Sequence, residues 1–371
     1  MQGDRLSPAQ CRRLLCTDGK GKGTFSGAAM SQETKTIDHL GEFGFIRSIM
    51  KGCIQNSERV IRGIGDDCAV IGPYGNRVFL ITTDLLMEHV HFLPGRKSFR
   101  DLGAKTVAVN LSDIAAMGGV PRHLFLSIAI PKGMLIEDLN QLYAGMKEMC
   151  GLHRVNLLGG DTSASSDGLF INITLIGEAD PRAVLYRNGA SPGDTVYVTG
   201  ALGNAQAGLH LLTGKMRAPH EISEQLIVAH NRPQPRVETG RLIAESLLAS
   251  AMIDISDGLT SDLGHLCEES AVGARLFEEW LPLSEELKIF CRVNNLDPRA
   301  IALSGGEDYE LLFTVPEKNA YSLERQVKRK GHQIFKLGEI VRERGLHLVS
   351  SEGRERQINP SGFNHFSRES P

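Results

Sequence analysis

The chain has 371 residues, a length that favours two domains and supplies enough apolar side chains for cores without disulfide bonds. Its 41 Lys and Arg against 44 Asp and Glu give a net charge of −3, so no basic field is available to hold nucleic acid or an anionic membrane. No apolar run approaches the ~18 residues of a membrane span. Seven cysteines without a Cys-x-x-Cys pair favour a reduced, cytoplasmic protein.

Residues 1–30 include a Gly/Lys tract at 19–24 and show no apolar periodicity, so we expect a disordered extension. From residue 31, apolar runs of strand length alternate with helical patterns, which predicts an α/β (α+β) domain over 31–180. The expected elements are a helix at 37–53, strands at 60–64 and 77–82, a helix at 99–117, a strand at 124–130, a helix at 136–150, and strands at 155–158 and 170–176.

Pro and Gly become frequent between residues 178 and 194, and Ser191-Pro-Gly-Asp194 predicts a turn. We therefore expect a domain boundary here and a second α/β domain over 181–371. Its expected elements are a strand at 196–199, helices at 205–212 and 235–248, a strand at 252–255, a helix at 259–269, a strand at 310–315, a helix at 321–330, and strands at 334–337 and 346–349.

Acidic residues follow glycines or end elements at several places. They are Asp66-Asp67, Asp84, Asp113, Asp161, Asp254, Asp257 and Glu307-Asp308. One such Asp is usually a turn or N-cap residue, but a set of this size predicts carboxylates gathered around a divalent cation, because gathered carboxylates repel one another. Oxygen ligands of this kind suit Mg²⁺. Asp66 and Asp308 are expected instead to be solvated turn residues.

The common catalytic and nucleotide motifs are absent. The segment from Gly63 lacks the third glycine of a dinucleotide fingerprint, and no phosphate-binding P-loop, His-Glu-x-x-His, protein-kinase catalytic loop or Gly-x-Ser-x-Gly occurs.

Six ordered motifs resemble the thiamine-monophosphate kinase family. They are Gly63-Ile-Gly-Asp-Asp-Cys-Ala69, Thr82-Thr-Asp84, Ala108-Val-Asn-Leu-Ser-Asp113, Gly159-Gly-Asp161, Ile253-Asp-Ile-Ser-Asp-Gly258 and Leu303-Ser-Gly-Gly-Glu-Asp-Tyr-Glu310. The resemblance covers about residues 38 to 366. It implies the two-domain fold of aminoimidazole ribonucleotide synthetase, with an N-terminal domain that forms a homodimer through its sheet. It also implies ATP-dependent phosphorylation of thiamine monophosphate to thiamine diphosphate.

The resemblance further implies roles for individual residues. The Mg²⁺ shell would be Asp67, Thr82, Thr83, Asp84, Asp113, Asp161, Asp254 and Asp257. The ATP contacts would be Gly160, Asp161, Arg187, Ser256 and Tyr143, and the thiamine contacts His91, Glu307 and Phe363. The alternatives are structural: a half-buried His91, a Phe363 that anchors packing, an Arg187 in a surface ion pair and a Glu307 that caps a loop.

The chemistry agrees with a cation-rich site. Donor and acceptor are both phosphates, and two unit charges 4 Å apart repel by about 4 kcal/mol at an effective dielectric near 20. Several Mg²⁺ ions would offset this repulsion. The acceptor phosphate is largely dianionic at pH 7, so we expect direct in-line transfer with no dedicated general base and no catalytic residue beyond those that position metal and phosphate.

Other functions remain open at this point. Selenophosphate synthetase would need a reactive Cys near its glycine-rich N-terminal segment, and a hydrogenase-maturation relative would need a C-terminal Cys, whereas the last Cys here is Cys291. Aminoimidazole ribonucleotide synthetase would carry other motifs in place of Ser304-Gly-Gly-Glu307. A metal-dependent phosphatase and a non-catalytic nucleotide-binding regulator are the alternatives from other classes.

Overall fold

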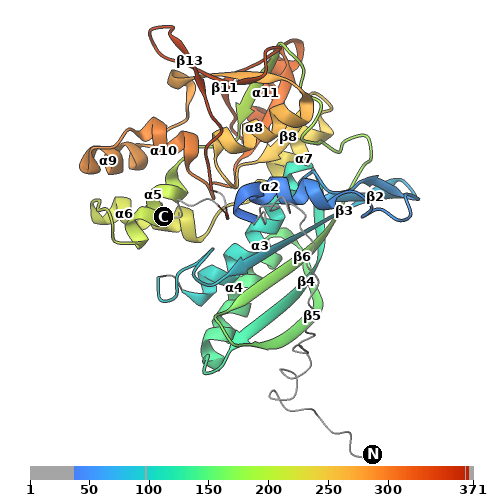
Figure 1. Ribbon diagram of the computed structural model, residues 1–371, viewed down its shortest axis with the longest axis vertical. Helices are drawn as coiled ribbons and strands as arrows, with labels where there is room; N and C mark the ends of the chain where they lie inside the picture. The colour runs from blue at the N-terminus through green and yellow to red at the C-terminus, as the bar shows by residue number, and fades with distance from the viewer. Residues whose placement is uncertain (1–36, 97, 364, 367–371) are drawn as a thin grey trace, which may run out of the picture.

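The computed structural model describes residues 37–96, 98–363 and 365–366. The disordered extension expected at 1–30 lies outside these residues. The chain forms two mixed β-sheets with helices packed on them, one sheet from each half of the sequence (Figure 1). The predicted α/β class is therefore confirmed.

The first sheet has the strand order β1-β2-β3-β6-β4-β5. Its strands are β1 (Val60–Arg62), β2 (Ala69–Tyr74), β3 (Arg77–Met87), β4 (Val120–Pro131), β5 (Asn156–Ser165) and β6 (Phe170–Ala179). Only the neighbours β4 and β5 run parallel, because helix α4 (Ile136–His153) connects them as a crossover. The remaining neighbours pair antiparallel.

Helix α3 (Phe99–Ala116) lies between this sheet and the second half of the chain. Ser98 caps it, since its hydroxyl accepts a hydrogen bond from the Asp101 amide at 3.0 Å. Almost every residue from Leu102 to Ala116 is buried, so the helix has no solvated face. Polar residues that α3 carries are therefore held inside the protein.

The opposite face of the first sheet carries no helix in the described chain (Figure 1). In β6 buried residues alternate with partly exposed ones, the pattern of a strand covered on one side only. Phe125 on β4 and Leu85 on β3 point to the open side and are 39% and 46% exposed.

The second sheet has the order β13-β12-β9-β11-β7-β10-β8. Its strands are β7 (Asp194–Val198), β8 (Ala251–Asp254), β9 (Gly273–Phe277), β10 (Leu311–Pro316), β11 (Phe335–Val341), β12 (Gly345–Val349) and β13 (Glu355–Ile358). Strands β7, β8 and β10 are buried on both faces, which explains their continuous apolar sequences.

Helices cover both faces of this sheet, and the apolar core on one face continues into the first half of the chain. They are α5 (Asn204–Leu212), α6 (His220–Asn231), α7 (Val237–Glu245), α8 (Leu259–Ser270), α9 (Glu285–Asn294), α10 (Pro298–Ser304), α11 (Glu317–Arg329) and the 3₁₀ turn η1 (Glu278–Trp280). Helix α2 (Ile37–Ile49), expected to reach residue 53, bends at Gly41 (φ 63°). None of the described helices combines the length and apolarity that a membrane span requires.

The strand expected at 155–158 is longer in the structure. Gly159, Gly160 and Asp161 were expected to follow that strand, but they lie inside β5. Gly160 pairs with Leu126 of β4 so closely that a Cβ atom there would lie 1.6 Å from the Leu126 carbonyl oxygen. The glycine permits close strand contact rather than a turn.

Helices α3 and α4 also cross at glycines. A Cβ atom on Gly145 would lie 1.8 Å from the Arg100 carbonyl oxygen, and one on Gly103 would lie 1.9 Å from that of Leu142. We therefore predict that Gly145→Ala pushes the two helices apart and lowers the free energy of unfolding by about 1–3 kcal/mol in urea denaturation. Gly151→Ala on the same helix meets no atom within 4 Å and should be neutral or stabilising. Equal stability of both variants would contradict this packing.

Candidate functional site

A cavity of about 1250 Å³ lies between the two halves of the chain. Its walls come from the loop after β1, the middle of β3, the loop after β3, helix α5, and the loops after β8 and α10. The C-terminal segment around Phe363 completes it. This volume exceeds that of an ordinary single-ligand pocket, so two small molecules can be accommodated together.

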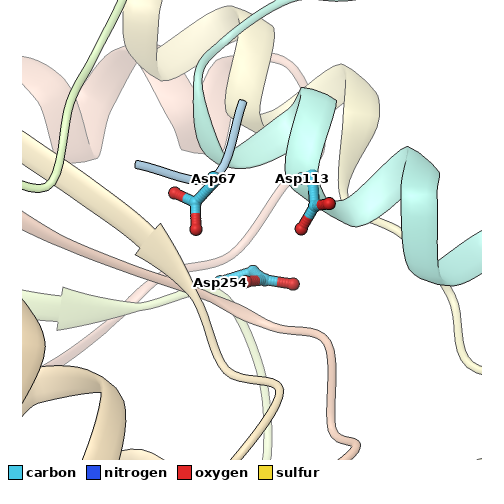
Figure 2. Close-up of side chains that lie close together, drawn as sticks. All are labelled: Asp67, Asp113 and Asp254. Carbon is cyan, nitrogen blue, oxygen red and sulfur yellow. The ribbon is translucent and has the colours of Figure 1, made fainter. Parts of the chain in front are cut away.

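Three carboxylates meet at one end of this cavity. Asp67 comes from the loop after β1, Asp113 from α3 and Asp254 from the end of β8, and each offers an oxygen within 4.8 Å of the others (Figure 2). Asp67 and Asp254 are 8% and 3% exposed. The strand and the helix that carry Asp254 and Asp113 are buried elements, so Asp254 has little contact with water and Asp113 is half-buried.

Neighbouring hydroxyl groups orient two of these carboxylates. Ser112 Oγ donates to Asp254 Oδ2 at 2.6 Å, and Thr82 Oγ1 donates to Asp113 Oδ2. Ser112 and Asp113 are adjacent on α3, so this helix supplies one carboxylate and fixes another.

Burial and mutual repulsion raise the pKa values of the clustered carboxyl groups, because both disfavour the ionised form. Burial first, and then Asp67, raise the pKa of Asp254 to about 7 and that of Asp84 to about 6. The pKa of Asp113 is also raised, by burial and by Asp84 and Asp254. At neutral pH the group therefore needs positive charge from elsewhere.

The Arg187 side chain brings a positive charge to this end of the cavity. Arg187 contacts Asp67 Oδ1 through Nη2 at 2.5 Å and through Nε at 3.1 Å, and its backbone amide donates to Asp66 at 3.2 Å. Asp67 Oδ2 is buried and has no hydrogen-bond partner among the described residues. One guanidinium cannot balance the three carboxylates of the cluster, and their oxygen atoms suit hard divalent cations such as Mg²⁺.

The two residues expected to be solvated turn residues are not. The Asp66 side chain is fully buried, and its Oδ2 lies 3.0 Å from Arg62 Nε. Asp308 accepts hydrogen bonds from the Gly203 and Ala205 amides at the start of α5, at 2.6 and 3.2 Å. Both expectations failed because each carboxylate also accepts a hydrogen bond from a backbone amide far along the chain, that of Arg187 for Asp66 and that of Gly203 for Asp308. A local turn signal does not reveal such partners.

Asp257 lies beside the cluster at the start of α8. Burial first raises its pKa to about 6. Its amide and that of Gly258 donate to the buried Asp262 at 3.2 and 3.0 Å, so Asp262 fixes the loop from within. The sequence analysis missed Asp262, whose only signal is its place in the first turn of a helix.

Three aromatic side chains, His91, Phe363 and His365, lie at another part of the cavity wall. His91 Nδ1 accepts a hydrogen bond from the Met87 amide at 3.0 Å, and burial first lowers its pKa to about 4. Its ring lies 5.0 Å from that of His365, which packs edge-on against Phe363 at 4.8 Å. The Phe363 amide donates to the Asp257 carbonyl at 3.0 Å and so attaches this segment to the acidic end.

The structure brings most of the sequence-predicted residues to this one cavity. Its lining includes Asp67, Thr82, Thr83, Asp84, Asp113, Asp254, Asp257, Arg187, Ser256, His91, Glu307 and Phe363. Three predicted residues are not in the lining. Gly160 and Asp161 are exposed on the edge strand β5, and Tyr143 is half-buried on α4 against the core.

The chain is similar in sequence to a known protein family and to several enzymes. The N-terminal domain of AIR synthase related protein matches residues 65–179, and the C-terminal domain matches 191–350. Thiamine-monophosphate kinase of Bacillus subtilis is 35% identical over 333 residues, which cover 88% of this chain and 100% of the relative. The same enzyme of Escherichia coli K12 is 35% identical over 334 residues, covering 88% and 98%.

Solved structures agree with these relatives. The structure described as AaThiL complexed with AMPPCP and TMP has 34% sequence identity and a TM-score of 0.78, and covers 90% of this chain and 99% of that one. The hydrogenase maturation protein HypE in complex with ATP has a TM-score of 0.64 at 19% identity, which shows a shared fold only.

The raised pKa values predict an unusual pH dependence for the cation-free protein. A folded-state pKa near 6–7, above the unfolded value of 3.8, contributes stability below pH 4 that is lost as the pH rises through 7. We expect Asp254→Asn to remove part of this loss. In EDTA the variant should exceed the native chain in unfolding free energy by about 1–3 kcal/mol at pH 8, and this advantage should shrink as the pH falls and disappear below about pH 4.

Urea denaturation at several pH values measures this difference. Asp167→Asn changes an exposed acid outside the cavity lining and serves as the matched control. Parallel pH profiles for the native chain and Asp254→Asn would show that the cluster carries no such stored repulsion.

Proposed function

The chain belongs to the thiamine-monophosphate kinase family and phosphorylates thiamine monophosphate at the expense of ATP, and we propose that it does so by direct in-line transfer at the buried acidic cluster. The observation that carries this proposal is a cavity large enough for two substrates with that cluster at one end. An acidic site binds two polyanions only when cations bind with them.

Mg²⁺ is the cation that these oxygen donors suit. When bound, it would neutralise phosphate charge and hold donor and acceptor in line. We propose that Asp67, Asp113 and Asp254 hold it, with Asp84, Asp257, Thr82 and Thr83 as further oxygen donors around the same end of the cavity. The unpartnered Asp67 Oδ2 supports this assignment.

The remaining wall residues position the substrates. Arg187 and Ser256 line the acidic end and are proposed as contacts to ATP. His91, Glu307 and Phe363 lie in the wall formed with the C-terminal segment and are proposed as contacts to the thiamine group. His91 offers a largely neutral ring at pH 7, since its pKa is about 4, and Phe363 offers a flat apolar surface.

We propose that the protein is a homodimer, which would account for two of the predicted residues outside the cavity lining, Gly160 and Asp161. Gly160 and Asp161 lie on an exposed edge strand, next to the uncovered face of the first sheet. We propose that two copies pair through that face, which brings β5 of each copy near its neighbour. Tyr143 faces the core and is proposed only as an indirect neighbour of the nucleotide. Consumption of ATP and the free thiols of the described cysteines support a cytoplasmic location.

An ADP-release assay with and without thiamine monophosphate tests the activity. We expect ADP only with this acceptor, together with thiamine diphosphate as product. No ADP above background would contradict the function, and a labelled phospho-enzyme trapped after mixing with ATP alone would contradict direct transfer.

In the same assay, Asp113→Asn should lower kcat on the order of 100-fold, because it removes a charged cation ligand. Its thermal unfolding should remain cooperative. Asp167→Asn should retain the native rate, and a native rate for Asp113→Asn would exclude this carboxylate as a ligand.

The dimer predicts a sedimenting mass twice the 40.5 kDa of the chain. Phe125→Glu places a charge on the open sheet face and should yield a monomer. Tyr321→Glu, on a 69% exposed side chain of α11, should leave the mass unchanged. A native chain that sediments as a monomer at micromolar concentration would refute this arrangement.

A further inference from the structure

Helix α3 carries a fully buried cation beside the cavity. Lys105 is 0% exposed and is among the largest completely buried side chains of the described chain. Its Nζ lies 2.6 Å from Glu307 Oε1, so the two side chains form an ion pair. Burying an ammonium group is costly, and a buried pair is seldom a net gain in stability over apolar residues. Its presence therefore suggests a role besides stability.

Glu307 is held on both oxygens. Its Oε2 lies 3.0 Å from Nδ1 of His230, which is 4% exposed in the last turn of α6. The two partners thus come from different halves of the chain, one from α3 and one from α6. Together they leave the carboxylate little freedom to rotate.

The backbone at Glu307 is fixed as well. Its φ of 65° lies in the left-handed region, and its amide donates to the Ser256 carbonyl at 2.7 Å. The next residue, Asp308, accepts from the Gly203 amide at 2.6 Å, and the Tyr309 amide donates to the Ile255 carbonyl at 2.8 Å. A strained backbone held by this many bonds indicates that the side-chain direction matters.

Only one partner of this ion pair reaches the cavity. Glu307 lines it and its side chain is 27% exposed, whereas Lys105 is absent from the lining. The contact through which Lys105 can orient a group in the cavity is therefore its ion pair with Glu307.

We propose that Lys105 is a positioning residue, which together with His230 fixes the Glu307 carboxylate toward the positively charged thiamine group of the acceptor. The proposal rests on the proposed function, in which Glu307 contacts that group. A carboxylate that is already held in place loses little conformational entropy when the thiamine group binds. The expected effect of this preorganisation is a higher affinity for the acceptor. The ATP site, at the acidic end of the cavity, is not affected.

A double-mutant cycle tests this dependence. Lys105→Met keeps an unbranched side chain without the charge, and Glu307→Gln keeps the shape of its partner. Each single change should raise KM for thiamine monophosphate about tenfold and leave KM for ATP within about twofold. If Lys105 acts through Glu307, the double variant should be no worse than the worse single variant.

The matched control breaks another ion pair with a buried acid. Arg236 contacts Glu310 at 2.5 Å, and neither residue lines the cavity. Arg236→Met should lower the unfolding temperature without changing KM for thiamine monophosphate. If Lys105→Met alone does not fold, Glu307→Gln and the charge-balanced double variant are compared, and equal KM values are expected.

Two results would overturn the proposal. One is an unchanged KM for thiamine monophosphate in Lys105→Met or Glu307→Gln. The other is multiplication of the two effects in the double variant, which would make Lys105 a purely structural residue. A native chain that releases no ADP with thiamine monophosphate would instead refute the proposed function, so the two failures are distinguishable.

Discussion

Repulsion between buried carboxylates is the constraint on which the rest of the site depends. Asp67, Asp113 and Asp254 come from three distant segments and meet within 4.8 Å at one end of the cavity, where two of them are buried. Folding therefore brings together carboxylates whose mutual repulsion opposes folding. The buried helix α3 and strand β8 hold two of them in place. Such a site is completed by cations, and cations are what a reaction between two phosphates needs.

The charged groups at two places in the cavity wall differ in how they are balanced. At the acidic end, three carboxylates face the single positive charge of Arg187, so bound cations are needed to neutralise the remaining negative charge. At Glu307, Lys105 and His230 hold a single carboxylate, which is prepared for an organic cation rather than a metal ion. Helix α3 carries both Lys105 and Asp113, so one rigid element relates the two positions.

Much of the fold and of the candidate site could be predicted from the sequence, because strand ends and glycine-rich turns are typical places for ligand-binding residues. The apolar runs predicted β7, β8 and β10, and the ordered acidic motifs predicted a shared site. The sequence did not reveal contacts made across the fold. Asp308 reads as a turn residue, yet it caps α5 a hundred residues away. Edge strands and short helices such as β13 and α10 were missed, since their stability comes from tertiary packing rather than local pattern. Lys105 lies in a mainly apolar stretch of α3, and its partner could be found only in the structure.

The most direct test of the account is the location of a divalent cation in crystals grown with Mn²⁺ and a non-hydrolysable ATP analogue. Anomalous scattering from Mn²⁺ identifies the ion and its ligands without reference to activity. The account predicts at least one Mn²⁺ bound by oxygens of Asp67, Asp113 and Asp254. Nucleotide bound in the cavity with no anomalous peak at these three carboxylates would contradict it.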